Sequence, residues 1–170
     1  MIEPHGRRAD SWWGTIPSGP GNLIPATRVT ISVVTRIGIE LVPQVAGRIM
    51  GIRYYIDSGQ DPPFEGMIVD RAAVQYPRVY QFKWGVATTG TGWRNTWIRP
   101  ALRAAAHQIF DVWVMQSAFY WRTINEIAAG PVTRFNIKCN GSMQATGTLP
   151  PAAPTLNTNA NGVDILFQPD

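Results

Sequence analysis

Apolar residues recur at every second position along most of this chain, and clusters of Gly, Pro, Asn, Asp and Ser interrupt them about every ten residues. A spacing of two belongs to strands, whose side chains alternate between two faces, whereas a helix repeats its apolar residues every three or four positions. Segments 28–42 and Gly47–Ile56 show the alternation most clearly. The pattern predicts an all-β fold, an antiparallel, jelly-roll-like β-sandwich of about eight strands.

The strands can be placed by residue range. We expect further strands over 67–73, 79–86, 93–98, 109–116, 117–124 and 163–168. Residues 131–139 alternate imperfectly and form either a strand or a long loop. Segment 28–42 is long for one strand, and Thr35-Arg36 or Gly38 could divide it. Ile49 is out of phase with the apolar residues after it, and a bulge near Gly51 would correct the phase.

One stretch favours helix. Residues 101–108 are rich in alanine and other good helix formers, so we expect one or two helical turns there, followed by a strand.

The length of 170 residues, or 18.8 kDa, suits one domain with a possible extension. We expect residues 21–170 to form a single β-sandwich, with a Pro/Asn-rich loop at 149–162 inside it because an apolar strand follows that loop. Residues 1–20 contain Trp12 and Trp13 among glycines and prolines. We expect this arm to become ordered by docking on a neighbour.

Charge and composition exclude several classes of protein. Of the 15 basic residues all but Lys83 and Lys138 are arginine, and they are scattered along the sequence without a basic stripe, so we expect no direct contact with nucleic acid. No run of 18 apolar residues exists, which predicts no membrane span, and the N-terminus lacks the apolar core of a secretory signal. The single cysteine, Cys139, excludes an internal disulfide framework.

Catalytic and metal sites are poorly supplied. Asp57, Asp61 and Glu65 lie four apart in one loop, but they lack the calcium-loop pattern, and we expect an ordinary solvated loop. No spacing of acidic residues singles out a pair of carboxylates for general acid/base catalysis. No serine lies in a G-x-S-x-G motif, so the sequence shows no nucleophile for which His107 could act as the base. We therefore expect no enzyme, no catalytic or metal-binding residue and no cofactor.

The seven tryptophans are the strongest local signal. Trp113 has the opposite parity from Val112 and Val114, so if the valines face the core, Trp113 faces outward and needs a partner. Trp93 and Trp97 share a strand face. Aromatic rings of this kind either fill the core and subunit interfaces or stack on sugar rings, and both roles stay open. The residues that would contact a partner are Trp12, Trp13 and Trp113, and those that would grip a glycan are Trp93, Trp97, Tyr120 and Trp121.

Five segments carry a resemblance to a known family. They are 12–20 (WWGTIPSGP), 36–55 (RIGIELVPQVAGRIMGIRYY), 89–114 (TGTGWRNTWIRPALRAAAHQIFDVWV), 118–124 (AFYWRTI) and 161–170 (NGVDILFQPD). Their order resembles that of an uncharacterised β-sandwich family, a domain of unknown function found in secreted actinobacterial proteins and in minor tail proteins of actinobacterial phages. The motifs consist mostly of turns and core positions, so the resemblance implies the fold and carries over no catalytic residue.

The resemblance and the composition together lead to an expected function. We expect a stand-alone structural component of a phage virion, a minor tail protein or a capsid-surface decoration protein, that assembles through apolar and aromatic contacts. Its partners would be other virion proteins, as a homo-oligomer or array, and its location the virion. The competing hypothesis is a carbohydrate-binding module that grips a cell-envelope glycan on the host surface.

Overall fold

The chain forms only strands, turns and connecting segments in the part that the structure describes. This structure is a computed structural model, and it describes residues 9–14, 27–56, 65–71, 78–82, 92–123, 132–145, 156–157 and 159–170. No helix long and apolar enough to cross a membrane occurs among these residues. The strands are β1 (Thr27–Pro43), β2 (Gly47–Ile56), β3 (Glu65–Asp70), β4 (Arg78–Phe82), β5 (Gly92–Ala104), β6 (Phe110–Thr123), β7 (Val132–Arg134), β8 (Ile137–Ala145), β9 (Asn159–Asn161) and β10 (Val163–Pro169).

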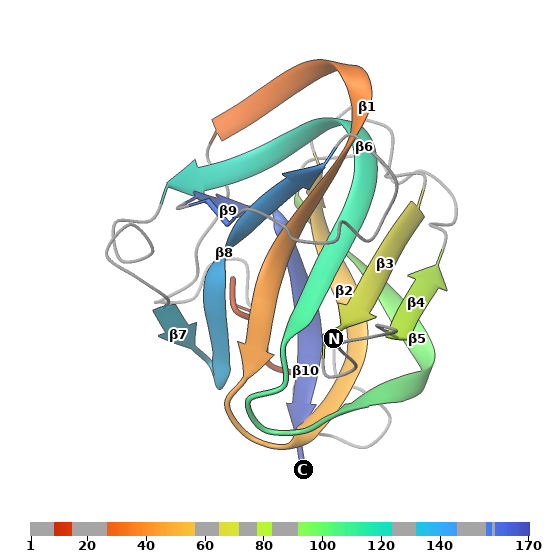
Figure 1. Cartoon of the computed structure of the whole chain (residues 1–170), viewed down its shortest axis with the longest axis vertical. Helices are drawn as coiled ribbons and strands as arrows, with labels where there is room; N and C mark the ends of the chain where they lie inside the picture. Colours follow the sequence, from red (N-terminus) through yellow and green to blue (C-terminus); the bar gives the residue numbers. More distant parts are fainter. Residues whose placement is uncertain are drawn as a thin grey trace.

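The strands make two antiparallel sheets that pack face to face (Figure 1). The larger sheet has seven strands, in the order β4-β3-β6-β1-β8-β7, with β9 pairing with β6. The smaller sheet has three strands, in the order β10-β2-β5. The predicted antiparallel β-sandwich is confirmed, with two more strands than the eight expected.

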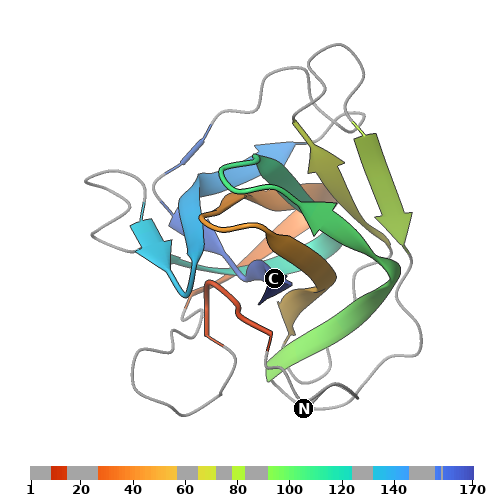
Figure 2. The ribbon, with the colours of Figure 1, turned by 90° about the horizontal axis from the view of Figure 1, so that it is seen from below.

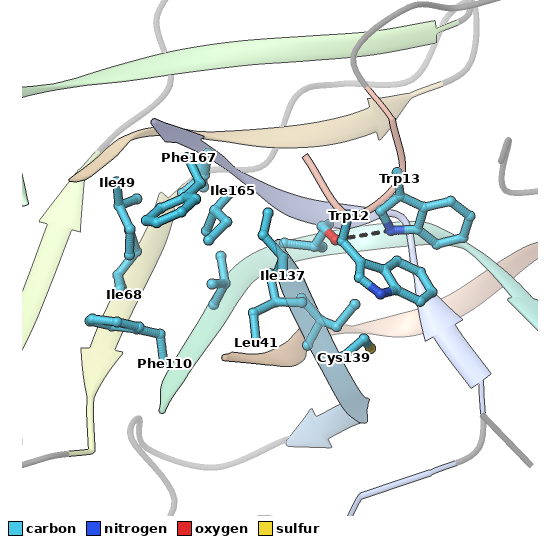
Figure 3. Packing of buried hydrophobic residues seen from close by; sticks show 14 of the residues in the cluster. Trp12, Trp13, Leu41, Ile49, Ile68, Phe110, Ile137, Cys139, Ile165 and Phe167 are labelled. Carbon is cyan, nitrogen blue, oxygen red and sulfur yellow. Dashed lines mark hydrogen bonds between the residues drawn. The ribbon is translucent and has the colours of Figure 1, made fainter. Parts of the chain in front are cut away.

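The core lies between the two sheets because alternate side chains of both sheets point into the same space. Ile52 and Tyr54 of β2 lie opposite Ile165 and Val163 of β10 and are fully buried with them. The larger sheet contributes Ile37, Ile39, Leu41, Phe110, Val112 and Val114 to the same cluster. Figure 3 shows this packing from close by, with Leu41 of β1 and Phe110 of β6 on one side and Ile165 and Phe167 of β10 on the other.

β2 confirms its predicted range and its bulge. The pairing of β2 with β5 shifts between Ile49 and Gly51, and the pairing with β10 shifts at the same place. The shift turns Ile49 onto the core face, where it is fully buried. β1 is continuous from Thr27 to Pro43, so neither Thr35-Arg36 nor Gly38 divides it, but its register against β6 changes just before Thr35.

The helical turns expected after Pro100 do not form. Residues 101–104 continue β5, and only 105–109 turn the chain into β6. Leu102 and Ala104 are buried while Arg103 is exposed, which is strand alternation inside an alanine-rich sequence. Pairing with Ile49 and Gly47 of β2 therefore overrides the helix propensity of these residues.

Segment 131–139, expected to form a strand or a long loop, is a hairpin. β7 and β8 are joined at Phe135 and Asn136, which both have a positive φ, of 49° and 61°. Two central residues with positive φ make the tight turn whose twist matches antiparallel strands. Asparagine tolerates this conformation and phenylalanine seldom adopts it, so the turn could hardly be predicted from these two residues.

The Pro/Asn-rich segment 149–162 contains a short strand. Residues 149–155 and Thr158 lie outside the described residues, while Asn159–Asn161 form β9 and pair with the end of β6.

Part of the predicted N-terminal arm belongs to the sandwich itself. Residues 9–14 lie against its side (Figure 2), and Asp10 forms a bridge with Phe167 on the free side of β10. Trp12 and Trp13 are fully buried in the core cluster of the same chain. Their place is the edge of this chain's own core, where their large indole groups fill the space beside β10, so we correct the expectation that they contact a neighbour. The rest of the 1–20 arm lies outside the described residues.

Candidate functional site

Three turns meet at one end of the sandwich, which we call the turn end (turns 44–46, 105–109 and 135–136). Backbone hydrogen bonds connect them through turn 44–46 and the strand residue before it: His107 N donates to Pro43 O at the end of β1 over 2.7 Å, and Gln44 N donates to Asn136 O over 2.8 Å. The first two turns and the C-terminus lie at the lower end of the molecule in Figure 1. The end is therefore a connected surface built from segments far apart in sequence.

Each of these turns presents an exposed apolar side chain. Val45 is 38% exposed, Ile109 38% and Phe135 44%. Among the described residues the remaining large apolar side chain with comparable exposure is Leu156, at 40%, which lies beside Gly141 of β8. Exposed apolar side chains scattered singly need no explanation, but gathering on one surface is typical of a contact site.

A pocket of about 630 Å³ opens at the same end. Its walls come from the β1–β2 turn, the end of β5, the β5–β6 turn and the C-terminus, including Ala46, Leu102, Ala104 and Gln108. Arg103, Asp70 and Asp170 also line it, so both signs of charge border a mostly small, apolar wall. The volume falls in the range of small-molecule sites.

Arginines also gather at this end, although they are scattered in the sequence. Arg48 of β2 and Arg103 of β5 are directly opposite each other, and both side chains are exposed. They lie on the outer face of the three-stranded sheet, since the neighbouring residues Ile49 and Leu102 are buried in the core. Arg99 of β5 is exposed as well.

A buried polar network lies farther along the same outer face, under residues 11–14. Ser11 Oγ donates a hydrogen bond to Asp164 Oδ2, and Trp13 N donates to the same oxygen over 2.8 Å. Arg53 Nη1 donates to Ser11 Oγ over 2.7 Å and also to Gly14 O. Burial raises the pKa of Asp164 and lowers the pKa of Arg53, and each group partly opposes the shift of the other. The network pins the N-terminal segment onto the sheet.

Trp93 joins this network through its ring. Its centroid lies 5.6 Å from that of Trp13 and 5.4 Å from that of Tyr55, and the Arg53 guanidinium lies 4.6 Å from it. Trp13 Nε1 donates to Val163 O over 3.2 Å, as Figure 3 shows. Trp93 therefore helps to hold the N-terminal segment, and because it is only half-buried its contact with a glycan stays a prediction.

The other predicted glycan contacts are not brought together with Trp93 in one cluster. Trp97 lies on the outer face of β5, opposite Gly51, and is half-buried. Tyr120 and Trp121 lie in β6, in the other sheet, and their side chains lie outside the described part of the chain. A glycan platform made of these four side chains remains a prediction.

Trp113 faces away from the core as its parity predicts, but it is not exposed. It is fully buried with Met67, Val69 and Met143 on the outer face of the larger sheet. Its indole lies against Gly38, where a Cβ atom would come within 2.8 Å of Trp113 Cδ2. The expected contact with a partner is therefore corrected, because residues of the same chain already surround this side chain.

Asp111 has a raised pKa, as acid/base catalysts often do, but its carboxyl group is not accessible to a substrate. Burial raises the pKa of Asp111 to about 6, with the nearby Glu40 adding to the shift and the Arg71 ion pair opposing it. Glu40 is its direct cross-strand neighbour. Asp111 is fully buried and is not among the residues that line the pocket, so a substrate in the pocket would not meet it.

The candidate metal loop falls largely outside the structure's description. Asp57 and Asp61 lie outside the described residues, and Glu65 begins β3. Within the described ranges no group of three or more His, Cys, Asp or Glu side chains could hold a metal ion. Cys139 is buried in the core, and burial raises the pKa of its thiol.

The chain was compared with protein families, curated proteins and solved structures. No protein-family model, no curated protein and no solved structure matches the chain.

Proposed function

We propose that the chain is a non-enzymatic structural component of a phage virion, a minor tail or capsid-surface subunit, and that it binds its neighbours through the turn end. The observation that carries the proposal is that Val45, Ile109 and Phe135, each more than a third exposed, stand on three turns at one end of the sandwich. The end of β1 and turn 44–46 are hydrogen-bonded to the other two turns. A folded domain gains nothing from exposing these side chains together unless another surface covers them.

The neighbouring arginines fit the same role. Protein interfaces combine a central apolar area with a polar rim, and arginine and aromatic residues are enriched in them. At the turn end Arg48 and Arg103 adjoin the exposed apolar turns. The resemblance to a family found in phage minor tail proteins supports the choice of the virion as the assembly. Other virion proteins, or further copies of this chain, would be the partners.

The test replaces two apolar side chains of the turn end. We expect Val45→Asp combined with Ile109→Asp to leave the domain folded, because both residues are exposed, and to reduce incorporation into particles at least tenfold. Quantitative mass spectrometry of purified virions measures incorporation, and circular dichroism of the isolated protein checks the fold. Leu156→Asp is the matched control, because it introduces the same group at a similarly exposed apolar residue on another surface.

Two results would contradict the proposal. One is normal incorporation of the folded double variant. The other is the absence of the wild-type protein from purified particles.

A second proposal assigns glycan binding to Trp97. Its ring takes part in none of the ring contacts found among the described residues, and it lies partly exposed on the outer face of the three-stranded sheet. Titration calorimetry with host cell-wall fragments tests this role. We expect Trp97→Ala to abolish binding, and a wild-type protein that binds no fragment would dismiss the proposal.

A further inference from the structure

The three-stranded sheet carries the net charge of the protein. β2 and β5 contain five arginines and no acidic residue, and β10 contains one aspartate, so the net charge of this sheet is +4. The formal net charge of the whole chain is also +4. All other residues therefore sum to zero, and the positive charge that looks dispersed in the sequence is concentrated on one sheet.

One of these five arginines is matched by the aspartate of the same sheet. Arg53 is buried in the network with Asp164, and the two charges face each other. The other four arginines of the sheet are Arg48, Arg94, Arg99 and Arg103, and three of them are exposed. The guanidinium groups of Arg48 and Arg103 form no ion pair with another described residue. The carboxyl groups of Asp70 and Asp170 line the same pocket as Arg103 without forming an ion pair with it.

The placement of Arg48 opposite Arg103 is unfavourable for the isolated domain. Directly opposed cross-strand residues are close neighbours, and like charges at such positions destabilise a sheet. A fold that needed only solubility could have placed one acid in either position. Two guanidinium groups side by side suit a ligand that brings carboxylates, because each group can bind one carboxylate through two parallel hydrogen bonds.

We propose that Arg48 and Arg103 bind the carboxylates of an acidic segment on a neighbouring protein. This inference rests on the proposed function, since it names the chemistry of the partner at the same turn end. A protein segment is favoured over a polyphosphate or a sulfated glycan because the arginines adjoin the exposed apolar Val45 and Ile109. An acidic protein segment can cover charge and apolar surface together, whereas a polyanion covers charge alone.

The test uses three probes and two single charge reversals. A fluorescein-labelled oligoglutamate peptide, a short DNA duplex and a heparin oligosaccharide are titrated with the whole protein, and binding is followed by fluorescence anisotropy or by competition. We expect the peptide to bind, and we expect Arg103→Glu to weaken its binding at least tenfold. Lys138→Glu is the control, because it makes the same change of charge at a half-buried residue of β8 in the other sheet.

A stability measurement separates binding from a structural role. We expect Arg103→Gln to bind the peptide weakly while its melting temperature stays level or rises, since the repulsion from Arg48 is relieved. The inference is overturned if the peptide does not bind, if Lys138→Glu weakens binding as much as Arg103→Glu, or if the duplex or the heparin displaces the peptide at lower concentration. The binding measurements use the isolated protein and the incorporation experiment uses virions. The acidic-segment inference can therefore fail while the proposed function stands, and the proposed function can fail while the peptide still binds.

Discussion

Replacing Ser11 with alanine is the most direct way to test how the N-terminal segment is held. The Ser11 hydroxyl donates to the fully buried Asp164 and accepts a hydrogen bond from Arg53. The variant removes both bonds, while Asp164 keeps the N–H groups of Trp13 and Ile165. A hydrogen bond to a charged group contributes about 1.5 to 3 kcal/mol, and a buried group left short of a partner costs a similar amount. We expect the free energy of unfolding to fall by about 3 kcal/mol.

Urea denaturation followed by tryptophan fluorescence measures this loss. For a domain of this size each kcal/mol lowers the melting temperature by about 2 to 4 °C, so Ser11→Ala should melt about 6 to 12 °C below the wild type. Ser142→Ala is the control: Ser142 is equally buried but belongs to β8, outside the network, and we expect a loss under about 1 kcal/mol. If Ser11→Ala were no less stable than Ser142→Ala, the account of the network would be wrong.

Three further outcomes follow from the packing and the charges. Trp12→Ala should lose about 3 to 5 kcal/mol in urea denaturation, because it empties a fully buried site, and a loss below about 1 kcal/mol would mean that Trp12 lies outside the core. Gly51→Ala should lose about 1 to 3 kcal/mol, since its Cβ atom would press on the backbone carbonyl of Thr96; a variant as stable as the wild type would disprove this close approach. The pKa of Asp111 is raised to about 6 in the folded state, so the folded state holds its proton more tightly than the unfolded state and this stability is lost as the pH rises from about 4 through 6. Asp111→Asn should therefore flatten the fall of the melting temperature between pH 4 and 7, and an unchanged slope would show that the carboxyl group is already ionised at low pH.

The alternation of apolar residues was enough to predict the sandwich, because a strand with one buried face has apolar residues at every second position. The bulge at Gly51 was predictable for the same reason: Ile49 was out of phase with the residues after it. At 101–104 the high helix propensity of alanine favoured the wrong prediction of a helix. The alternation of buried Leu102 with exposed Arg103 is the strand signal in this segment.

The candidate site could not be predicted in this way because it depends on register. Arg48 and Arg103 are 55 positions apart, and only the pairing of β2 with β5 makes them neighbours. The parity of Trp113 was correct, but parity does not say whether other residues of the chain cover an outward face. For Trp12 and Trp13 the local composition resembled that of a free arm, and the buried Asp164 that binds the segment lies some 150 residues away.

The placement of β10 determines when the molecule can finish folding. This strand lies between β2 on one side and Asp10 on the other, and the Ser11–Asp164 hydrogen bond spans 153 positions. On the ribosome, residues 9–14 emerge early and have no docking surface until residues 163–169 have also emerged. Contacts of such long range make folding slow, because the chain must close a large loop before it gains their energy. The sandwich therefore closes only once residues 163–169 have emerged, and until then Trp12 and Trp13 are apolar surface that the cell must protect from aggregation.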